Sequence, residues 1–325
     1  MKKILGIGNA LVDILTQIPN DDILQELQLP KGTMQHVDAA TSLCYGEILK
    51  QYGLAMAAGG STANTMSGAA KLGVETGYIG KVGCDERGRF FEDAMRETGV
   101  HPMMLTTETP TGCAEAIIST DGERTFATYL GAALELCADD IQPEMLDGWD
   151  VFYVEGYLVQ NHVLLDKVLP MAKAKGLRTA LDMASFNVVE ENRDYLRQLT
   201  KDYLDIVFAN EDEARAFTHL EDPKAALNEL ASMCDIAIVK VGAEGSLVQH
   251  GDEVITIGPI PAHVIDTTGA GDLWAAGFMA GLVQNKPLEQ CAKMGATLAA
   301  NIIEVIGAKM DEKRWQKILD SLKVL

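Results

Sequence analysis

Short, continuous apolar runs recur along the chain, and longer stretches with helical spacing separate them. The runs occupy residues 3–8, 76–83, 151–156, 178–183, 205–210 and 236–242. They are continuous rather than alternating in polarity, which is typical of strands that are buried on both faces of a sheet. The pattern therefore predicts a mainly parallel central sheet.

Helix start and stop signals lie between these runs. One helix is expected to begin at Ser61 or Thr62 and to end near Gly73. A second is expected to follow Asp85 and to stop at Gly99. Hydroxyl and carboxylate side chains cap helix starts, and glycine commonly ends helices. The alternation of strands and helices predicts an α/β fold with helices on both faces of the sheet.

Two regions, at about residues 12–37 and 101–130, depart from this rhythm. They carry shorter, more polar strand-like pieces, and turn residues such as Pro110 and Gly122 predict hairpins. We interpret the two regions as one accessory sheet that serves as a lid beside an active site. With no repeat or linker in the sequence, we expect residues 1–325 to form a single core domain with this β lid.

Length and composition fit a globular protein and narrow its partners. The chain has 325 residues, and 47% of them are hydrophobic, which is enough for a sizeable core. A formal net charge of −20 with scattered basic residues repels a phosphate backbone, so we expect no nucleic acid partner. No apolar run is long enough to cross a bilayer, and the six cysteines are far apart, which predicts a cytoplasmic protein without a membrane partner.

The most informative segment is VIDTTGAGDLWAAGFMAGL at residues 264–282. It predicts a strand, a tight turn and an apolar helix. The small residues Gly269, Ala270 and Gly271 can form an anion hole for a phosphoryl group, because helix starts present free N–H groups. Asp272 could simply favour the helix dipole, or it could take the proton of an attacking hydroxyl. Its place beside the anion hole favours the role of a base.

A second glycine turn, in AAGGSTANTMSGAAKLG at residues 57–73, also opens a helix. Gly59 and Gly60 allow a ligand to approach the backbone closely, and Asn64 offers both a donor and an acceptor to hydroxyl groups. A tight helix start would explain the glycines equally well, so both interpretations stay open.

The N-terminal segment GIGNALVDIL carries Gly6 and Gly8, but Leu11 occupies the third glycine position of a dinucleotide-binding turn. The residues after Leu11 look extended rather than helical, so that motif is not matched. Asn9 and Asp13 are more informative. An aspartate within an apolar stretch is costly to bury alone, and substrate hydroxyls could satisfy it. The alternative is an exposed carboxylate on a lid strand.

Three further features admit two interpretations each. In FANEDEARAF, Asn210 and Glu213 lie at a helix start, where they could cap the helix or hold hydrated Mg²⁺. The glycine turn in VKVGAEGSLV, residues 239–248, is either an ordinary hairpin or a cover for a nucleotide. Arg124, in the predicted lid, either reaches phosphate charge or is solvated.

In this order, the motifs GGSTAN, NxxE, KVGxxG and DTTGAGD resemble those of the ribokinase family of carbohydrate kinases, also called the PfkB family. The resemblance covers almost the whole chain, and GNALVDI and TPTGCAEAI are similar to the adenosine kinase branch. It implies a ribokinase-like fold and an enzyme that transfers the γ-phosphoryl group of ATP to a hydroxymethyl group. Adenosine or a ribose-like sugar is the favoured acceptor, and the protein would be a monomer or a homodimer.

The resemblance also implies a role for each group of residues. The catalytic base would be Asp272, with an anion hole formed by Gly269, Ala270 and Gly271. The acceptor would be bound by Asn9, Asp13, Gly59, Gly60 and Asn64. The ATP site would be lined by Asn210, Lys240, Gly242, Gly245, Ala296 and Ala299. The ions would be Mg²⁺, held through water by Glu213, and K⁺, bound by oxygens of Asp266 and Thr268.

Other functions stay open on the sequence alone. A dinucleotide-dependent oxidoreductase would share the α/β alternation, but Leu11 breaks its glycine motif. A non-catalytic sugar or nucleoside sensor could keep the fold, although Asp272 and the complete GAGD turn favour an enzyme. Among enzymes, a kinase of a fructose-like sugar or a keto-sugar acid is the alternative.

Overall fold

In the computed structural model, which describes residues 2–323, nine strands form a large sheet. In spatial order they are β14 (Glu253–Ile257), β13 (Ser246–His250), β12 (Ile236–Lys240), β11 (Ile206–Asn210), β10 (Arg178–Asp182), β9 (Val151–Glu155), β1 (Ile4–Ile7), β5 (Thr76–Gly83) and β6 (Val100–Thr107). The strands from β12 to β6 run parallel, whereas β13 and β14 pair antiparallel at one edge. The predicted mainly parallel sheet is confirmed, and each of the six apolar runs forms one of its strands.

The large sheet is buried on both faces, as the continuous apolar runs predict. In β1, Leu5 and Ile7 belong to one hydrophobic core, while Ile4 belongs to the core on the opposite face. The same alternation places Phe152 of β9 in the first core and Tyr153 in the second. Since successive strand side chains point to opposite faces, a strand needs apolar residues at every position to fill both cores.

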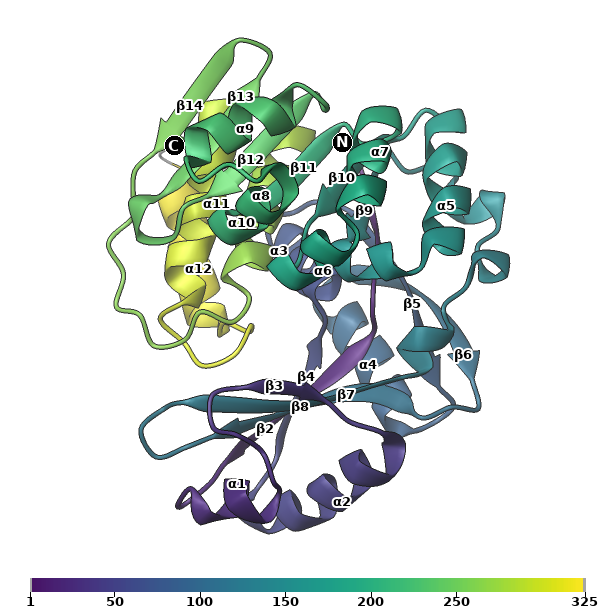
Figure 1. The fold of residues 1–325 in the computed structure, drawn as a ribbon, viewed down its shortest axis with the longest axis vertical. Helices are drawn as coiled ribbons and strands as arrows, with labels where there is room; N and C mark the ends of the chain where they lie inside the picture. The colour runs from purple at the N-terminus through teal and green to yellow at the C-terminus, as the bar shows by residue number, and fades with distance from the viewer. Residues whose placement is uncertain (1, 324–325) are drawn as a thin grey trace.

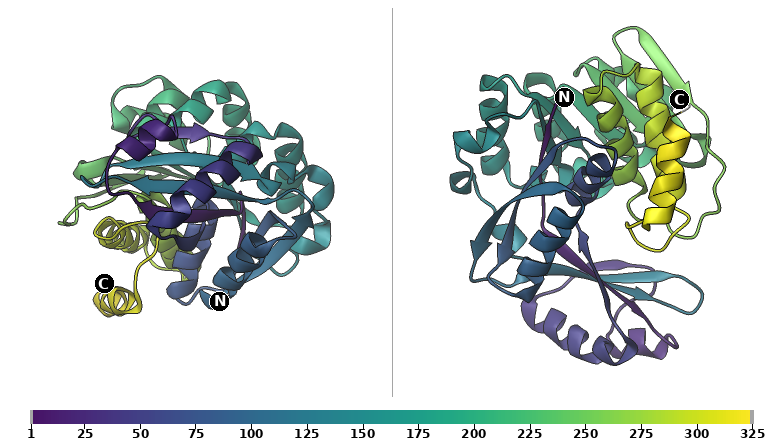
Figure 2. Two further views of the ribbon diagram at one scale, coloured as in Figure 1. Left: turned by 90° about the horizontal axis from the view of Figure 1, so that it is seen from below. Right: turned by 180° about the vertical axis from the view of Figure 1, so that it is seen from behind.

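Helices cover both faces of this sheet (Figures 1 and 2). The first core includes side chains of α5 (His162–Ala174), α6 (Phe186–Glu191), α7 (Arg193–Asp202), α8 (Glu211–Thr218) and α9 (Pro223–Ala231). The second includes side chains of α3 (Ser61–Lys71), α4 (Glu86–Glu97), α10 (Ala270–Val283) and α11 (Leu288–Ile302), and α12 (Glu312–Leu322) packs outside them. None of the helices within residues 2–323 is long and apolar enough to cross a membrane.

A second, smaller sheet lies at one end of this body (Figure 1). In spatial order its strands are β3 (Met34–His36), β8 (Arg124–Gly131), β7 (Thr111–Ile118), β2 (Leu11–Gln17) and β4 (Ala55–Gly59). Two helices, α1 (Asp22–Glu26) and α2 (Ala39–Leu49), cover the face that is turned away from the large body. Apolar residues such as Ile18, Leu24 and Ile117 form a separate small core there.

Three predicted boundaries need correction. The pattern assigns residues 101–130 to the lid, but β6 pairs in parallel with β5 along its whole length and so belongs to the large sheet. Residues 57–59, expected as part of a glycine turn, instead end β4, an edge strand antiparallel to β2. The strand expected before the GAGD turn is irregular, because the N–H groups of Ile265 and Asp266 both donate to the carbonyl oxygen of Ile303.

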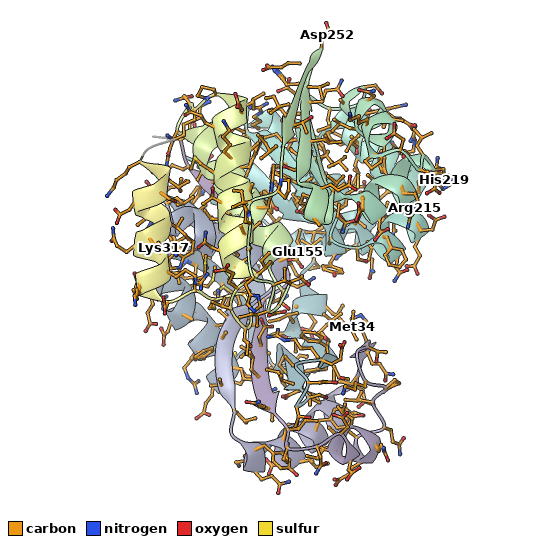
Figure 3. All side chains as sticks on the ribbon, turned by 90° about the vertical axis from the view of Figure 1, so that its left-hand side faces the viewer. Met34, Glu155, Arg215, His219, Asp252 and Lys317 are labelled. Atoms are coloured by element: carbon orange, nitrogen blue, oxygen red, sulfur yellow. The ribbon has the colours of Figure 1, made fainter. Side chains whose placement is uncertain are left out.

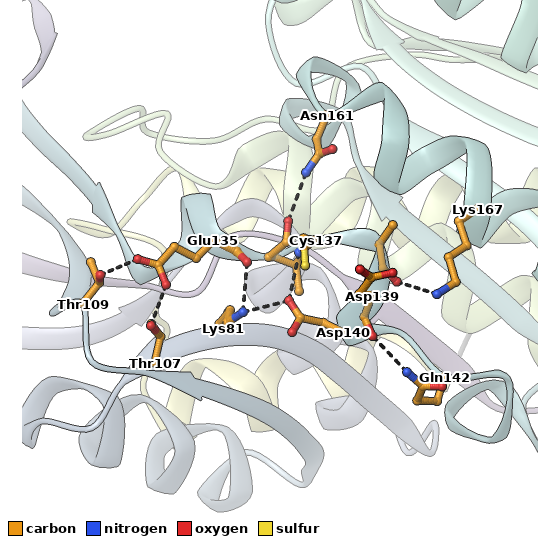
Figure 4. A network of polar contacts seen from close by, with 12 residues as sticks. Lys81, Thr107, Thr109, Glu135, Cys137, Asp139, Asp140, Gln142, Asn161 and Lys167 are labelled. Carbon is orange, nitrogen blue, oxygen red and sulfur yellow. Dashed lines mark hydrogen bonds and ion pairs between the residues drawn. The ribbon is translucent and has the colours of Figure 1, made fainter.

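A polar network anchors the segment through which the chain returns from the small sheet to the large body (Figure 4). Lys81, on β5, donates to the carbonyl oxygen of Glu135 at 2.9 Å and to the carboxylate of Asp140 at 2.8 Å. The Glu135 carboxylate accepts a hydrogen bond from the Thr107 hydroxyl at 2.5 Å, which adds β6 to the network. This connection therefore has one partly buried cation as its centre.

We expect Lys81→Met to destabilise the protein by about 1.5–3 kcal/mol, because it leaves the Asp140 carboxylate without its charged partner. Urea unfolding at constant pH, with unchanged slope, measures the loss. Lys50→Met is the matched control, because the exposed Lys50 makes only a loose ion pair with Glu47, at 3.9 Å. This substitution should lower the free energy of unfolding by no more than about 0.5 kcal/mol. Equal losses in the two variants would contradict the anchoring role.

Candidate active site

A cleft of about 840 Å³ opens at the carboxyl ends of the parallel strands, beside the first turns of α8 and α10. It brings together every residue that the motifs predict for a nucleotide and an anion hole. The lining includes Asn210, Glu213, Lys240, Gly242, Gly245, Gly269, Ala270, Gly271, Asp272, Ala296 and Ala299. Binding at the carboxyl edge of a parallel sheet is typical of α/β proteins, because loops and helix N-termini converge there.

Asp272 lies in the first turn of α10, which follows the left-handed residue Gly269 (φ +75°). One carboxylate oxygen accepts a hydrogen bond from the Ser61 hydroxyl at 2.7 Å, and the other accepts one from the Asn64 amide at 3.0 Å. Burial raises the pKa of Asp272, and these two hydrogen bonds oppose the rise. The first turn of α3 thus orients a carboxylate that can accept a proton.

The residues predicted to bind an acceptor lie near Asp272, around β2 and the start of α3. Burial raises the pKa of Asp13 to about 6, and none of the described side chains donates a hydrogen bond to its carboxylate. A β-carbon on Gly59 would lie 2.2 Å from an Asp13 oxygen, and one on Gly60 would lie 2.3 Å from the carbonyl oxygen of Asn9. The two glycines therefore make room for Asp13 and Asn9 themselves.

Glu155, at the carboxyl end of β9, is a site residue that the motifs do not identify. It lies at the junction between the large body and the small sheet (Figure 3). Its carboxylate accepts hydrogen bonds from the Asn9 side-chain amide at 2.8 Å and from the Thr62 backbone N–H at 3.2 Å. Burial raises its pKa to about 7. The sequence offered one signal for Glu155, which is a carboxylate at the end of a strand predicted to be buried in the parallel sheet.

Asp182 is a second residue that the motifs do not identify, and it forms an ion pair with Lys240. They end β10 and β12, and the Lys240 ammonium lies 2.9 Å from the Asp182 carboxylate. Burial lowers the pKa of Lys240, but the carboxylates of Asp182 and Glu213 outweigh it and raise the pKa above its usual value. A β-carbon on Gly271 would lie 3.2 Å from the ammonium nitrogen. A permanent positive charge therefore lies beside the anion hole.

Asn210 and Glu213 form the capping box of α8. Both Glu213 carboxylate oxygens accept hydrogen bonds from Asn210, at 2.7 Å from its backbone N–H and 2.8 Å from its side-chain amide. The Asn210 oxygen accepts the Glu213 N–H at 2.8 Å. Burial raises the pKa of Glu213 to about 7. Within residues 2–323, no group of three His, Cys, Asp or Glu side chains is placed to bind a metal directly, so any Mg²⁺ here needs water or phosphate ligands.

Arg124 reaches from the small sheet to the turn before α10. Its guanidinium lies 2.7 Å from Asp266 and donates to the Thr268 hydroxyl at 3.2 Å. Asp266 Oδ2, which pairs with Arg124, also accepts a hydrogen bond from the N–H of Gly307 at 2.6 Å. Asp266 Oδ1 accepts hydrogen bonds from the N–H and the hydroxyl of Thr268. The predicted K⁺ site does not fit this arrangement, because these side-chain oxygens already have partners and a guanidinium supplies the positive charge.

Comparison with known proteins places the chain in a family. Residues 32–314 match the pfkB family carbohydrate kinase domain. An uncharacterized sugar kinase of Archaeoglobus fulgidus is 30% identical over 248 residues, 74% of this chain and 96% of that protein. A 5-dehydro-2-deoxygluconokinase of Bacillus subtilis is 30% identical over 276 residues, 75% of this chain and 80% of that protein.

Among solved structures, the adenosine kinase from Sinorhizobium meliloti has a TM-score of 0.87 and 34% identity, covering 98% of this chain and 99% of that one. This likeness confirms the ribokinase-like fold and supports the adenosine kinase-like branch. Together with the family match over residues 32–314, it confirms the resemblance carried by the motifs. The chain belongs to the PfkB family of carbohydrate kinases.

Proposed function

We propose that this phosphotransferase uses ATP to phosphorylate the hydroxymethyl group of a sugar or nucleoside, with adenosine or a ribose-like acceptor favoured. The family makes it a kinase of a sugar or nucleoside alcohol. The observation that carries the finer proposal is the position of Asp272. Its carboxylate, held by Ser61 and Asn64, directly follows the anion-hole turn in the cleft and lies close enough to Asp13 to raise the pKa of that residue.

In the proposed reaction, Asp272 takes the proton of the acceptor hydroxyl as that oxygen attacks the γ-phosphorus of ATP. The bond from the γ-phosphorus to the β,γ-bridging oxygen breaks, and ADP leaves. The backbone N–H groups of Gly269 and Gly271 and the nearby Lys240 ammonium would stabilise charge on the phosphoryl oxygens, whereas the Ala270 N–H donates to the carbonyl oxygen of Thr267. Positioning and charge neutralisation supply most of the catalysis in such transfers.

In the proposed complex, small side chains of the cleft would contact the adenine of ATP, and carboxylate oxygens would hold Mg²⁺ through water. Ala296 and Ala299, on α11, and Gly242 and Gly245 would flank the adenine, where larger side chains would fill the space. Mg²⁺ would neutralise phosphate charge when bound. It binds through few protein oxygens and several waters, so Glu213 would hold it through water from the cleft wall.

Asp13 and a neighbouring row of apolar residues favour a nucleoside over a keto-sugar acid. On the acceptor side, Asn9, Asp13 and Asn64 would bind the sugar hydroxyls. The strand register aligns Leu15, Ala116, Phe126 and Met34 across the small sheet, on the face that also carries Asp13. An apolar row of this kind suits the planar face of a base, whereas a sugar acid has no apolar face to cover it.

The small sheet would act as the lid, with boundaries corrected to its five strands. The ion pair between Arg124 and Asp266 supports this role, because it joins the small sheet to the turn before α10. The second terminal nitrogen of Arg124 is buried without a partner among the described residues, so it could donate to a phosphate oxygen. A closed lid would exclude water, which otherwise competes as an acceptor.

ADP release from Mg·ATP tests the function across adenosine, other nucleosides, ribose, fructose and 5-dehydro-2-deoxygluconate. We expect the highest kcat/KM with adenosine, because its base can cover the apolar row and its ribose can reach Asp13. A higher value with the sugar acid would make the alternative acceptor correct. No release above the rate with water alone, for any compound, would favour a non-catalytic sensor.

We expect Asp272→Asn to lower kcat by at least about a thousandfold, because an amide keeps the shape but cannot accept the proton. ATP affinity, measured by calorimetry, should hardly change. Asp252→Asn is the matched control, since Asp252 lies at the tip of the β13–β14 hairpin, far from the cleft (Figure 3), and should keep full activity. An Asp272 variant with more than a tenth of the normal kcat would remove the base from the mechanism.

We expect Asp13→Ala to lower the acceptor kcat/KM about ten- to hundredfold, because substrate hydroxyls lose hydrogen bonds to a charged group worth about 1.5–3 kcal/mol. ATP binding without acceptor should be nearly unchanged. Asp13→Asn should do less damage, since its carbonyl oxygen still accepts one bond. Thermal melts exclude misfolding, and equal losses for ATP and acceptor would contradict the assignment.

A further inference from the structure

The loop between α11 and α12, residues 303–311, packs against both halves of the active site. A β-carbon on Gly269 would lie 2.8 Å from that of Ala308, so the loop rests on the anion-hole turn. A β-carbon on Gly307 would lie 3.5 Å from the Leu15 side chain, so the loop also meets β2 of the small sheet. No motif of the sequence includes this loop.

Lys309 extends from this loop into the acceptor side of the site. Its ammonium donates to the side-chain oxygen of Asn64 at 3.3 Å, and the Asn64 amide nitrogen donates to Asp272 at 3.0 Å. An ammonium can only donate and a carboxylate can only accept. The two partners therefore hold the Asn64 amide in one orientation, with its nitrogen toward the base.

The charges around Lys309 come from three elements. Asp13 on β2 and Asp272 on α10 favour its charged form, while burial lowers its pKa. Lys309 and Arg124 of β8 both lower the pKa of Asp13 against the effect of burial. Removing the ammonium should therefore raise the pKa values of both carboxyl groups.

The remaining charged groups that face Asp272 lie on the large sheet. Asp182 on β10 raises its pKa and Lys240 on β12 lowers it. Glu155 on β9 is also close, because Asp272 raises the pKa of Glu155. None of these three side chains is hydrogen-bonded to Lys309, so they form a constant background in a comparison of Lys309 variants.

We propose that Lys309 is a positioning residue of the acceptor site, which orients Asn64, and through it the carboxylate of Asp272, and supplies positive charge beside Asp13 and Asp272. The inference rests on the proposed kinase function, in which an ionised Asp272 accepts the hydroxyl proton. It assigns a role to a residue outside the GGSTAN and DTTGAGD motifs. A lysine with a merely structural role would support the loop without changing the ionisation of either carboxylate.

The test is the pH dependence of kcat/KM for the best acceptor, measured for the wild type, Lys309→Met, Lys309→Arg and Lys313→Met. We expect Lys309→Met to move the acid limb upward by about one pH unit, with about tenfold loss near the wild-type limb. Lys309→Arg should keep the acid limb at the wild-type pH, because arginine keeps the positive charge. Lys313→Met, on the exposed surface of α12, should match the wild type.

A second measurement does not depend on turnover. Carboxyl ¹³C NMR titrations, assigned with Asp13→Asn and Asp272→Asn, should show both pKa values higher in Lys309→Met than in the wild type. The proposal would be overturned if Lys309→Met left unchanged both the acid limb of the kcat/KM profile and the carboxyl pKa values. A Lys309→Met defect confined to ATP binding would also overturn it. A wild type without activity on any acceptor would instead overturn the kinase assignment, which separates the two failures.

Discussion

The Asp272 carboxylate is buried where the first turns of α3 and α10 meet, and hydrogen bonds from Ser61 and Asn64 fix both of its oxygens. A buried carboxylate without partners would be costly, and these donors offset that cost while leaving a proton acceptor. The arrangement requires the two helix starts to face each other. The large sheet meets this requirement by bringing segments more than 200 residues apart to one edge.

Charge balance explains why the same edge can contain so many ionisable groups. Asp182 is paired with Lys240, Asp266 with Arg124, and Asp13 and Asp272 share the influence of Lys309. The three cations Lys240, Arg124 and Lys309 come from β12, β8 and the loop between α11 and α12. The positive charge at this edge is therefore assembled by the fold and not by one basic segment. The added phosphate charges of ATP would need Mg²⁺ as well, because the protein's own cations already have acidic partners.

The sequence predicted most of the large sheet because its strands are buried on both faces and therefore read as continuous apolar runs. The placement of Asp272 and of Gly269, Ala270 and Gly271 at a helix start in the cleft was predictable, because these four residues are consecutive in the sequence. Glu155 and Lys309 were not, since their roles depend on contacts with Asn9 and Asn64 across 146 and 245 residues. The close approach of Asp13 to Gly59 was not predictable either, because that carboxylate lies on another strand.

The small sheet supplies both Asp13, the proposed acceptor-binding residue, and the cation Arg124, so in the proposed reaction acceptor binding depends on the position of this sheet over the large body. Asp13 on β2 and Arg124 on β8 belong to one hydrogen-bonded sheet, so neither can move far without the other. Arg124 is paired with Asp266, which lies just before the turn that binds phosphate in the proposed reaction. A displacement of the sheet that broke this pair would also carry Asp13 away from Asp272. The proposed acceptor residues and the proposed anion hole therefore come together only in one position of the small sheet.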